Sequence, residues 1–165
     1  MKQKILVVED DATSTEIIRI NLSHQGYDLT FVTSGKDAYD IALQQIPDLI
    51  LMDVKMPGWD GFETCRVFKS DKVLVNIPII FVTGAVNDIK KAFLAGGDDY
   101  VVKPIQQSEL HMRIGFHLER MRFIKEIKQL NLKSHRIIQQ QTADLASTNR
   151  RLVEALDELL RLKGK

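Results

Sequence analysis

The fold is decided by the stretch Asp48-Leu49-Ile50-Leu51-Met52-Asp53-Val54-Lys55-Met56-Pro57-Gly58. Its continuous apolar run predicts a short strand that is buried on both faces, as in a parallel sheet. The run stops at the Asp53 carboxylate, and Pro57-Gly58 is typical of a turn. Ligands of open α/β sheets bind outside the carboxyl ends of the strands. We therefore expect Asp53 to face a ligand at the edge of a sheet.

Similar apolar runs lie on both sides of that stretch, and helical patterns separate them. This alternation predicts a doubly wound α/β fold with a five-stranded parallel sheet. Spacing alone does not give the strand order, but right-handed crossovers and the common doubly wound orders favour the flavodoxin-like order 2-1-3-4-5. We expect strands at Lys4–Val8, Tyr27–Val32, Asp48–Met52, Pro78–Val82 and Asp99–Val102, and helices within 12–25 and at Gly35–Gln45, Phe62–Lys69 and Val86–Ala95.

The C-terminal third predicts one long helix from about Ser108 to Lys163, because no proline follows Pro104. At 1.5 Å per residue this helix would be roughly 80 Å long. Its seam residues recur at alternating steps of four and three, the heptad pattern of a coiled coil, after a shift of register near Met121. The seam comprises Ile127, Asn131, Ser134, Ile138, Gln141, Leu145, Thr148, Leu152, Ala155, Leu159 and Leu162.

Polar residues in the seam leave two interpretations open. Asn131, Ser134, Gln141 and Thr148 would weaken or fray a coiled coil, or they would fix its register and partner number at some cost in stability. The apolar segment Leu152–Leu162 is the best candidate for dimerisation. We expect a homodimer through the coiled coil.

Composition narrows the function classes. The net charge of +1 divides into −5 up to residue 110 (11 basic and 16 acidic residues) and +6 after it (12 and 6). An acidic globule is thus followed by a basic helix. The single cysteine, Cys65, excludes an internal disulfide and fits a reducing cytoplasm. Because no apolar run is long enough to cross a bilayer and the chain opens directly into a strand, we expect neither a membrane span nor a signal peptide.

Polar side chains follow four of the predicted strands, and the parallel arrangement brings them to one edge of the sheet. Crowded carboxylates repel one another unless a cation or protons intervene. Oxygen ligands without histidine or cysteine select Mg²⁺ or a similar hard cation, which shares phosphate oxygens with its substrate. A carboxylate can also act as a nucleophile and form an aspartyl phosphate. The converging residues are Glu9, Asp10, Asp53, Thr83 and Lys103.

Over about residues 3–120 the sequence resembles the receiver domain of two-component response regulators. The resemblance rests on four pieces in order, each at the end of a predicted strand. They are Val7-Val8-Glu9-Asp10, Asp53 with Met56-Pro57-Gly58 and Gly61, Thr83-Gly84-Ala85, and Asp99-Tyr100-Val101-Val102-Lys103-Pro104. It implies that Asp53 is a phosphoacceptor, served by a sensor histidine kinase or a phosphotransfer protein.

The resemblance also implies a magnesium site and a switch. Asp10, Asp53 and the backbone carbonyl of Lys55 would bind Mg²⁺ directly, and Glu9 would contribute through a water molecule. Thr83 and Lys103 would contact the phosphoryl group, and Tyr100 would be the switch aromatic. The Lys103–Pro104 peptide is expected to be cis.

We therefore predict a receiver domain at 1–120 and a coiled-coil dimerisation helix at 121–165. The receiver would be a regulatory phosphoacceptor rather than an enzyme, located in the cytoplasm. Its switch would control an output domain outside this sequence, such as a diguanylate cyclase or a histidine kinase. The alternative is a non-catalytic coiled-coil adaptor with a silent receiver.

Two further function classes are disfavoured by the residues themselves. A phosphatase of the aspartyl-phosphate type needs a second aspartate two residues after the nucleophile, where this chain has Lys55. Direct nucleic-acid binding is not expected either, because the basic C-terminal helix contains no helix-turn-helix signal and no basic-region motif.

Overall fold

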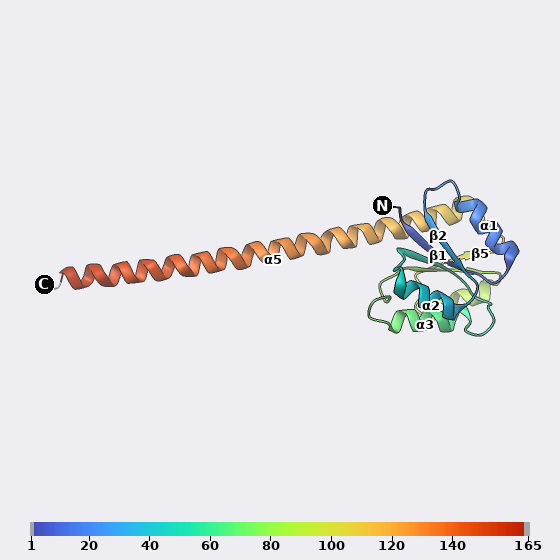
Figure 1. The fold of residues 1–165 in the computed structure, drawn as a ribbon, viewed down its shortest axis with the longest axis horizontal. Helices are drawn as coiled ribbons and strands as arrows, with labels where there is room; N and C mark the ends of the chain where they lie inside the picture. The colour runs from blue at the N-terminus through green and yellow to red at the C-terminus, as the bar shows by residue number, and fades with distance from the viewer. Residues whose placement is uncertain (1, 164–165) are drawn as a thin grey trace. The chain divides into compact units, whose positions relative to one another are not determined.

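The computed structural model describes residues 2–163 and contains a single five-stranded sheet within that range. All neighbouring strands are parallel and the order is β2-β1-β3-β4-β5, which confirms the predicted doubly wound fold (Figure 1). The elements are β1 Lys4–Val8, α1 Ala12–Leu22, β2 Asp28–Val32, α2 Gly35–Gln44, β3 Leu49–Asp53, α3 Gly61–Ser70, β4 Ile79–Thr83, the 3-10 turn η1 Val86–Asp88, α4 Ile89–Leu94, β5 Asp99–Val102 and α5 Gln107–Lys163.

Two separate layers of core side chains explain why the inner strands read as unbroken apolar runs. Every residue of β3 and β4 is buried, and the side chains alternate between the two faces of the sheet. On one face they pack against α1 and the first turns of α5, where Leu110, Ile114 and Leu118 are buried. On the other face they pack against α2, α3 and α4, through Phe68 among others. Helices α1 and α2 lie on opposite sides of the sheet in Figure 1.

Acidic residues and one serine fix where the helices begin. Asp11 accepts hydrogen bonds from the backbone N–H groups of Thr13 and Ser14 and so caps α1. Asp60 and Glu63 form a capping box at the start of α3. Ser34 caps α2 in the same way. The hydrogen bonds of Asp11 and Asp60 therefore mark both residues as helix caps.

The loop after β3 closes tightly because of Gly61. The Gly61 N–H donates to the carbonyl oxygen of Val54 at 3.0 Å, which brings the start of α3 against the end of β3. A Cβ atom at residue 61 would lie 2.1 Å from the carbonyl oxygen of Asp53 and 2.9 Å from the Cα atom of Val54. Both contacts are with backbone atoms, so any side chain here would displace the strand end that carries Asp53.

The strand ends differ by one residue from the prediction. Asp53 and Thr83 were expected just after their strands, but each is the last residue of its strand, paired with Val82 and Val102 respectively. The helix expected at Val86–Ala95 begins as a 3-10 turn, because the Asp88 N–H donates to the Ala85 carbonyl at 3.0 Å. The turn at 71–77 was not predicted as a buried element, yet Leu74 is fully buried there.

Helix α5 contributes to two compact units, one up to Met121 and one from Arg122. In the second unit every described side chain from Lys125 to Leu162 is exposed in the single chain, with Leu145, Leu152 and Leu159 each more than half exposed. None of the helices described in residues 2–163 is long and apolar enough to span a membrane. The Lys103–Pro104 peptide is cis, as the family resemblance implied.

Substituting Gly61 tests how tightly the site depends on this turn. We expect Gly61→Ala to lower the free energy of unfolding by about 3 kcal/mol, since the backbone of residues 53 and 54 must move to admit the methyl group. Urea unfolding measures this change. The matched control is Gly115→Ala in α5, where a Cβ meets open space. That control should stabilise the protein by about 0.5–1 kcal/mol. A Gly61→Ala protein as stable as the wild type would contradict the close approach.

Candidate functional site

Three carboxylates meet at the carboxyl edge of the sheet. Glu9 follows β1, Asp10 follows Glu9, and Asp53 ends β3. One oxygen from each of the three side chains lies within 4.8 Å of the others. Glu9 and Asp53 are buried and Asp10 is exposed, so the cluster has two fixed members and one member that faces solvent. The structure therefore brings together the acidic residues that the sequence placed at this edge.

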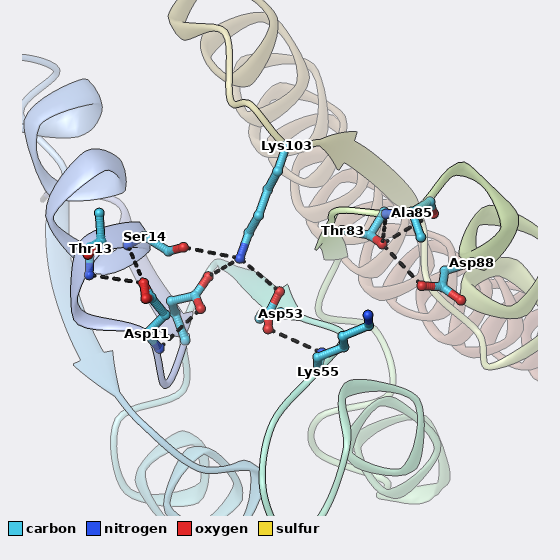
Figure 2. A network of polar contacts seen from close by, with 10 residues as sticks. Asp11, Thr13, Ser14, Asp53, Lys55, Thr83, Ala85, Asp88 and Lys103 are labelled. Carbon is cyan, nitrogen blue, oxygen red and sulfur yellow. Dashed lines mark hydrogen bonds and ion pairs between the residues drawn. The ribbon is translucent and has the colours of Figure 1, made fainter.

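Lys103 joins two of these carboxylates (Figure 2). Its Nζ atom lies 2.8 Å from Glu9 Oε2 and 3.1 Å from Asp53 Oδ1, and it donates to Ser14 Oγ at 3.2 Å. The lysine follows β5, so its side chain reaches across the edge of the sheet to β1 and β3. A single ammonium group thus balances charge from two strands in a largely buried position.

The pKa values of Glu9 and Lys103 follow from this geometry. Burial raises the pKa of Glu9, the nearby charge of Asp53 adds to the rise, and the hydrogen bond from Lys103 opposes it. For Lys103, burial alone would lower the pKa, but the hydrogen bond to Glu9 and the charge of Asp53 outweigh burial and raise it. Lys103 is therefore charged across the whole physiological pH range and serves as a fixed cation.

The remaining predicted residues lie around Asp53 in different ways. The backbone N–H of Lys55 donates to Asp53 Oδ2 at 3.1 Å, which orients the carboxylate. Thr83 ends the neighbouring strand β4 and is buried, with its hydroxyl near Ala85 and Asp88. Tyr100, on β5, is partly buried, and its ring packs edge-on against Phe93 with the ring centres 6.0 Å apart.

Comparison with known proteins decides the family. A family model described as the response regulator receiver domain matches residues 5–115, which is most of the chain. The chain belongs to the response regulator receiver domain family.

Curated relatives of this receiver domain are longer proteins. Over 122 residues the chain is 35% identical to the DNA-binding response regulator MtrA of Mycolicibacterium paratuberculosis, covering 73% of this chain and 53% of that protein. Over 131 residues it is 36% identical to the uncharacterized transcriptional regulatory protein YrkP of Bacillus subtilis, covering 78% and 55%. The chain therefore spans about half the length of the curated relatives that it matches.

A solved structure supports the same family assignment. The receiver domain of a sensor histidine kinase from Pseudomonas aeruginosa is 31% identical, with a TM-score of 0.68, and the match covers 72% of this chain and 99% of that one. That structure has a magnesium ion coordinated in its active-site cleft. In the present receiver domain, the three clustered carboxylates offer only oxygen ligands, which is the donor set that Mg²⁺ prefers. The residues present therefore fit a magnesium ion.

Two residues at the site were not anticipated from the sequence. Ser14 contacts Lys103 because the Asp11 cap places it in the first turn of α1, facing the edge of the sheet. Asp88 contacts Thr83 because η1 folds back over the end of β4. The cap signal of Asp11 could have located Ser14. No sequence spacing locates Asp88, since the 3-10 turn at 86–88 was not predicted.

Removing the ammonium group of Lys103 tests its role as a counter-ion. Without Mg²⁺, we expect Lys103→Met to lower the free energy of unfolding by about 2 kcal/mol, because Glu9 and Asp53 stay buried without their cation. With Mg²⁺, the variant should bind the ion about tenfold more tightly, since a neighbouring positive charge no longer opposes it.

Urea unfolding and isothermal titration calorimetry measure the two quantities. Lys36→Met, at an exposed lysine on α2, is the matched control and should change neither. An unchanged or weaker Mg²⁺ affinity in Lys103→Met would mean that the lysine does not compete with the metal.

Proposed function

We propose that this receiver domain accepts a phosphoryl group on Asp53 from a sensor histidine kinase or a phosphotransfer protein. The observation that carries the proposal is the position of the Asp53 carboxylate. It lies within the acidic cluster with Glu9 and Asp10, and it is ion-paired with Lys103 at 3.1 Å. A carboxylate held beside a fixed cation and a metal site is suited to nucleophilic attack on phosphorus.

In this proposal Mg²⁺ is held by Asp10, Asp53 and the backbone carbonyl of Lys55, with Glu9 acting through a water molecule. The ion would supply positive charge to the phosphoryl oxygens. The exposed Asp10 and the buried Glu9 and Asp53 form the only group of at least three clustered metal-ligating side chains in residues 2–163. The divalent cation and Lys103 together would offset the charge of three phosphoryl oxygens.

The transfer step uses groups of this chain for attack and positioning. An oxygen of Asp53 forms a bond to phosphorus while the bond from phosphorus to the donor histidine nitrogen breaks, and that nitrogen keeps the electron pair. Lys103 and the Thr83 hydroxyl then contact the phosphoryl oxygens. The Tyr100 ring changes position when Thr83 does. This movement reaches α5 because Tyr100 lies beneath Arg113, whose guanidinium carbon is 5.2 Å from the ring centre. The protein thereby regulates an output rather than turning over a substrate.

Phosphorylation by acetyl phosphate tests the acceptor. We expect the wild type to gain one phosphoryl group in the presence of Mg²⁺, observed by intact-protein mass spectrometry and removed by hydroxylamine, which cleaves acyl phosphates. Asp53→Asn should gain none, because an amide is a poor nucleophile. The matched control Asp28→Asn, at an exposed aspartate, should label like the wild type. An unlabelled wild type would favour the silent adaptor instead.

We also propose that residues 1–120 form the receiver and residues 121–165 form a coiled-coil helix that makes a homodimer and relays the switch to an output domain; residues 1, 164 and 165 of these ranges lie outside the described residues. The support is the exposed heptad seam: Ile138, Leu145, Leu152 and Leu159 are all more than half exposed in the single chain. A partner helix would remove this apolar surface from water. We suggest a diguanylate cyclase or a histidine kinase as the output domain.

Adjacent leucines provide a matched test of the coiled coil. Leu159 lies in the predicted seam, whereas Leu160 lies beside it, and the two are 57% and 62% exposed in the single chain. We expect Leu159→Lys to weaken dimerisation by at least about tenfold, since a buried leucine contributes roughly 2 kcal/mol per chain. Leu160→Lys should change it by less than about twofold. Analytical ultracentrifugation measures both, and equal effects would refute the seam.

A further inference from the structure

The buried hydroxyl of Thr83 is occupied by groups on the loop that follows β4. The hydroxyl oxygen accepts a hydrogen bond from the Ala85 N–H at 3.1 Å. Its single proton is shared between the Ala85 carbonyl at 3.3 Å and Asp88 Oδ2 at 3.4 Å. Figure 2 shows these interactions of Thr83 running to Ala85 and Asp88, whereas Lys103 contacts Asp53, Ser14 and Glu9. A charged carboxylate is the stronger of the two acceptors.

Asp88 is placed for this contact and not for an ordinary helix cap. It ends η1 and precedes α4, a position where an aspartate commonly accepts hydrogen bonds from the first N–H groups of the helix. Within the described residues, however, its side chain makes no such cap bond. The side chain is only 14% exposed, and its second oxygen lies 3.7 Å from Lys91 Nζ. The carboxylate is therefore held against the end of β4.

We propose that Asp88 is a positioning residue that holds the Thr83 hydroxyl in the orientation of the unphosphorylated receiver. The inference rests on the proposed phosphorylation of Asp53. A phosphoryl group there needs the hydroxyl proton of Thr83, so Thr83 must exchange Asp88 for a phosphoryl oxygen. Release of Asp88 thus couples the exchange at Thr83 to the start of α4. We call the contact between Asp88 and the Thr83 hydroxyl the latch. Because the latch must break first, it lowers the affinity of the site for a phosphoryl group.

Beryllofluoride, a phosphoryl analogue that binds aspartate carboxylates, measures the latch in the full chain. With Mg²⁺ present, its affinity is followed through the fluorescence of Trp59, the only tryptophan, or by calorimetry. We expect Asp88→Ala to bind beryllofluoride about fivefold more tightly, the effect of one released hydrogen bond of modest strength. Thr83→Ala should bind it more weakly than the wild type. In the Thr83→Ala background, Asp88→Ala should then have no further effect, because the group that it holds is gone.

The double-mutant comparison separates a latch from a general charge effect. If Asp88→Ala tightens binding equally with Thr83 present or absent, the loss of a negative charge explains the change and the latch is refuted. Lys91→Ala, which removes the other partner of Asp88, should leave beryllofluoride affinity within about twofold of the wild type. Mg²⁺ affinity without beryllofluoride reports that each variant keeps a folded site, and it should also stay within about twofold.

The beryllofluoride measurements also distinguish the proposed phosphorylation of Asp53 from the proposed role of Asp88. A wild type that binds no beryllofluoride, and whose Asp53→Asn variant behaves identically, overturns the proposed function together with the latch. A wild type that binds it through Asp53, with Asp88→Ala equal to or weaker than the wild type, overturns the latch alone.

Discussion

The site depends on the balance between buried carboxylates and one ammonium group. Glu9 and Asp53 are buried at the ends of the neighbouring strands β1 and β3, burial raises the pKa of Glu9, and Lys103 reaches both carboxylates from the end of β5. Without a cation these carboxylates would repel each other or bind protons. The lysine offsets the charge of both carboxylates, and the exposed Asp10 adds a third side chain to the group of oxygen ligands. The same carboxylates thus pair with Lys103 and fit a divalent cation.

This balance is possible only because the strands are parallel. In a parallel sheet the ends of β1, β3, β4 and β5 all lie at one edge, so residues far apart in the sequence become neighbours. Asp53 and Thr83 are still paired in the ladder, opposite Val82 and Val102, and their backbones are therefore fixed by the sheet. The loops that follow the strands supply further contacts to these two residues. Gly61 closes one loop against Asp53, and Asp88 closes the other against Thr83.

Apolar runs and the polar residues after them predicted the sheet and the convergence of Glu9, Asp53 and Lys103, because burial on both faces requires apolar strands. The strand order needed the further rule of right-handed crossovers and the common doubly wound orders. Two features could not be predicted in this way. The ladder extends one residue further than the apolar run, since backbone pairing does not require an apolar side chain at Asp53. The 3-10 turn at 86–88 depends on a single hydrogen bond between Asp88 and Ala85, and no periodicity reports such a bond.

The contacts of Thr83 and Tyr100 indicate how a change at the site would reach helix α5. Thr83 is paired with Val102 across the ladder from β4 to β5, and Tyr100 lies on the same strand β5. Arg113 on α5 stacks over the Tyr100 ring and pairs with Asp99 at 2.6 Å, so one guanidinium group contacts two consecutive residues of β5. His117, also on α5, lies 3.2 Å from the second oxygen of Asp99. A shift of Asp99 and Tyr100 on β5 would therefore disturb contacts of two consecutive turns of α5, at Arg113 and at His117.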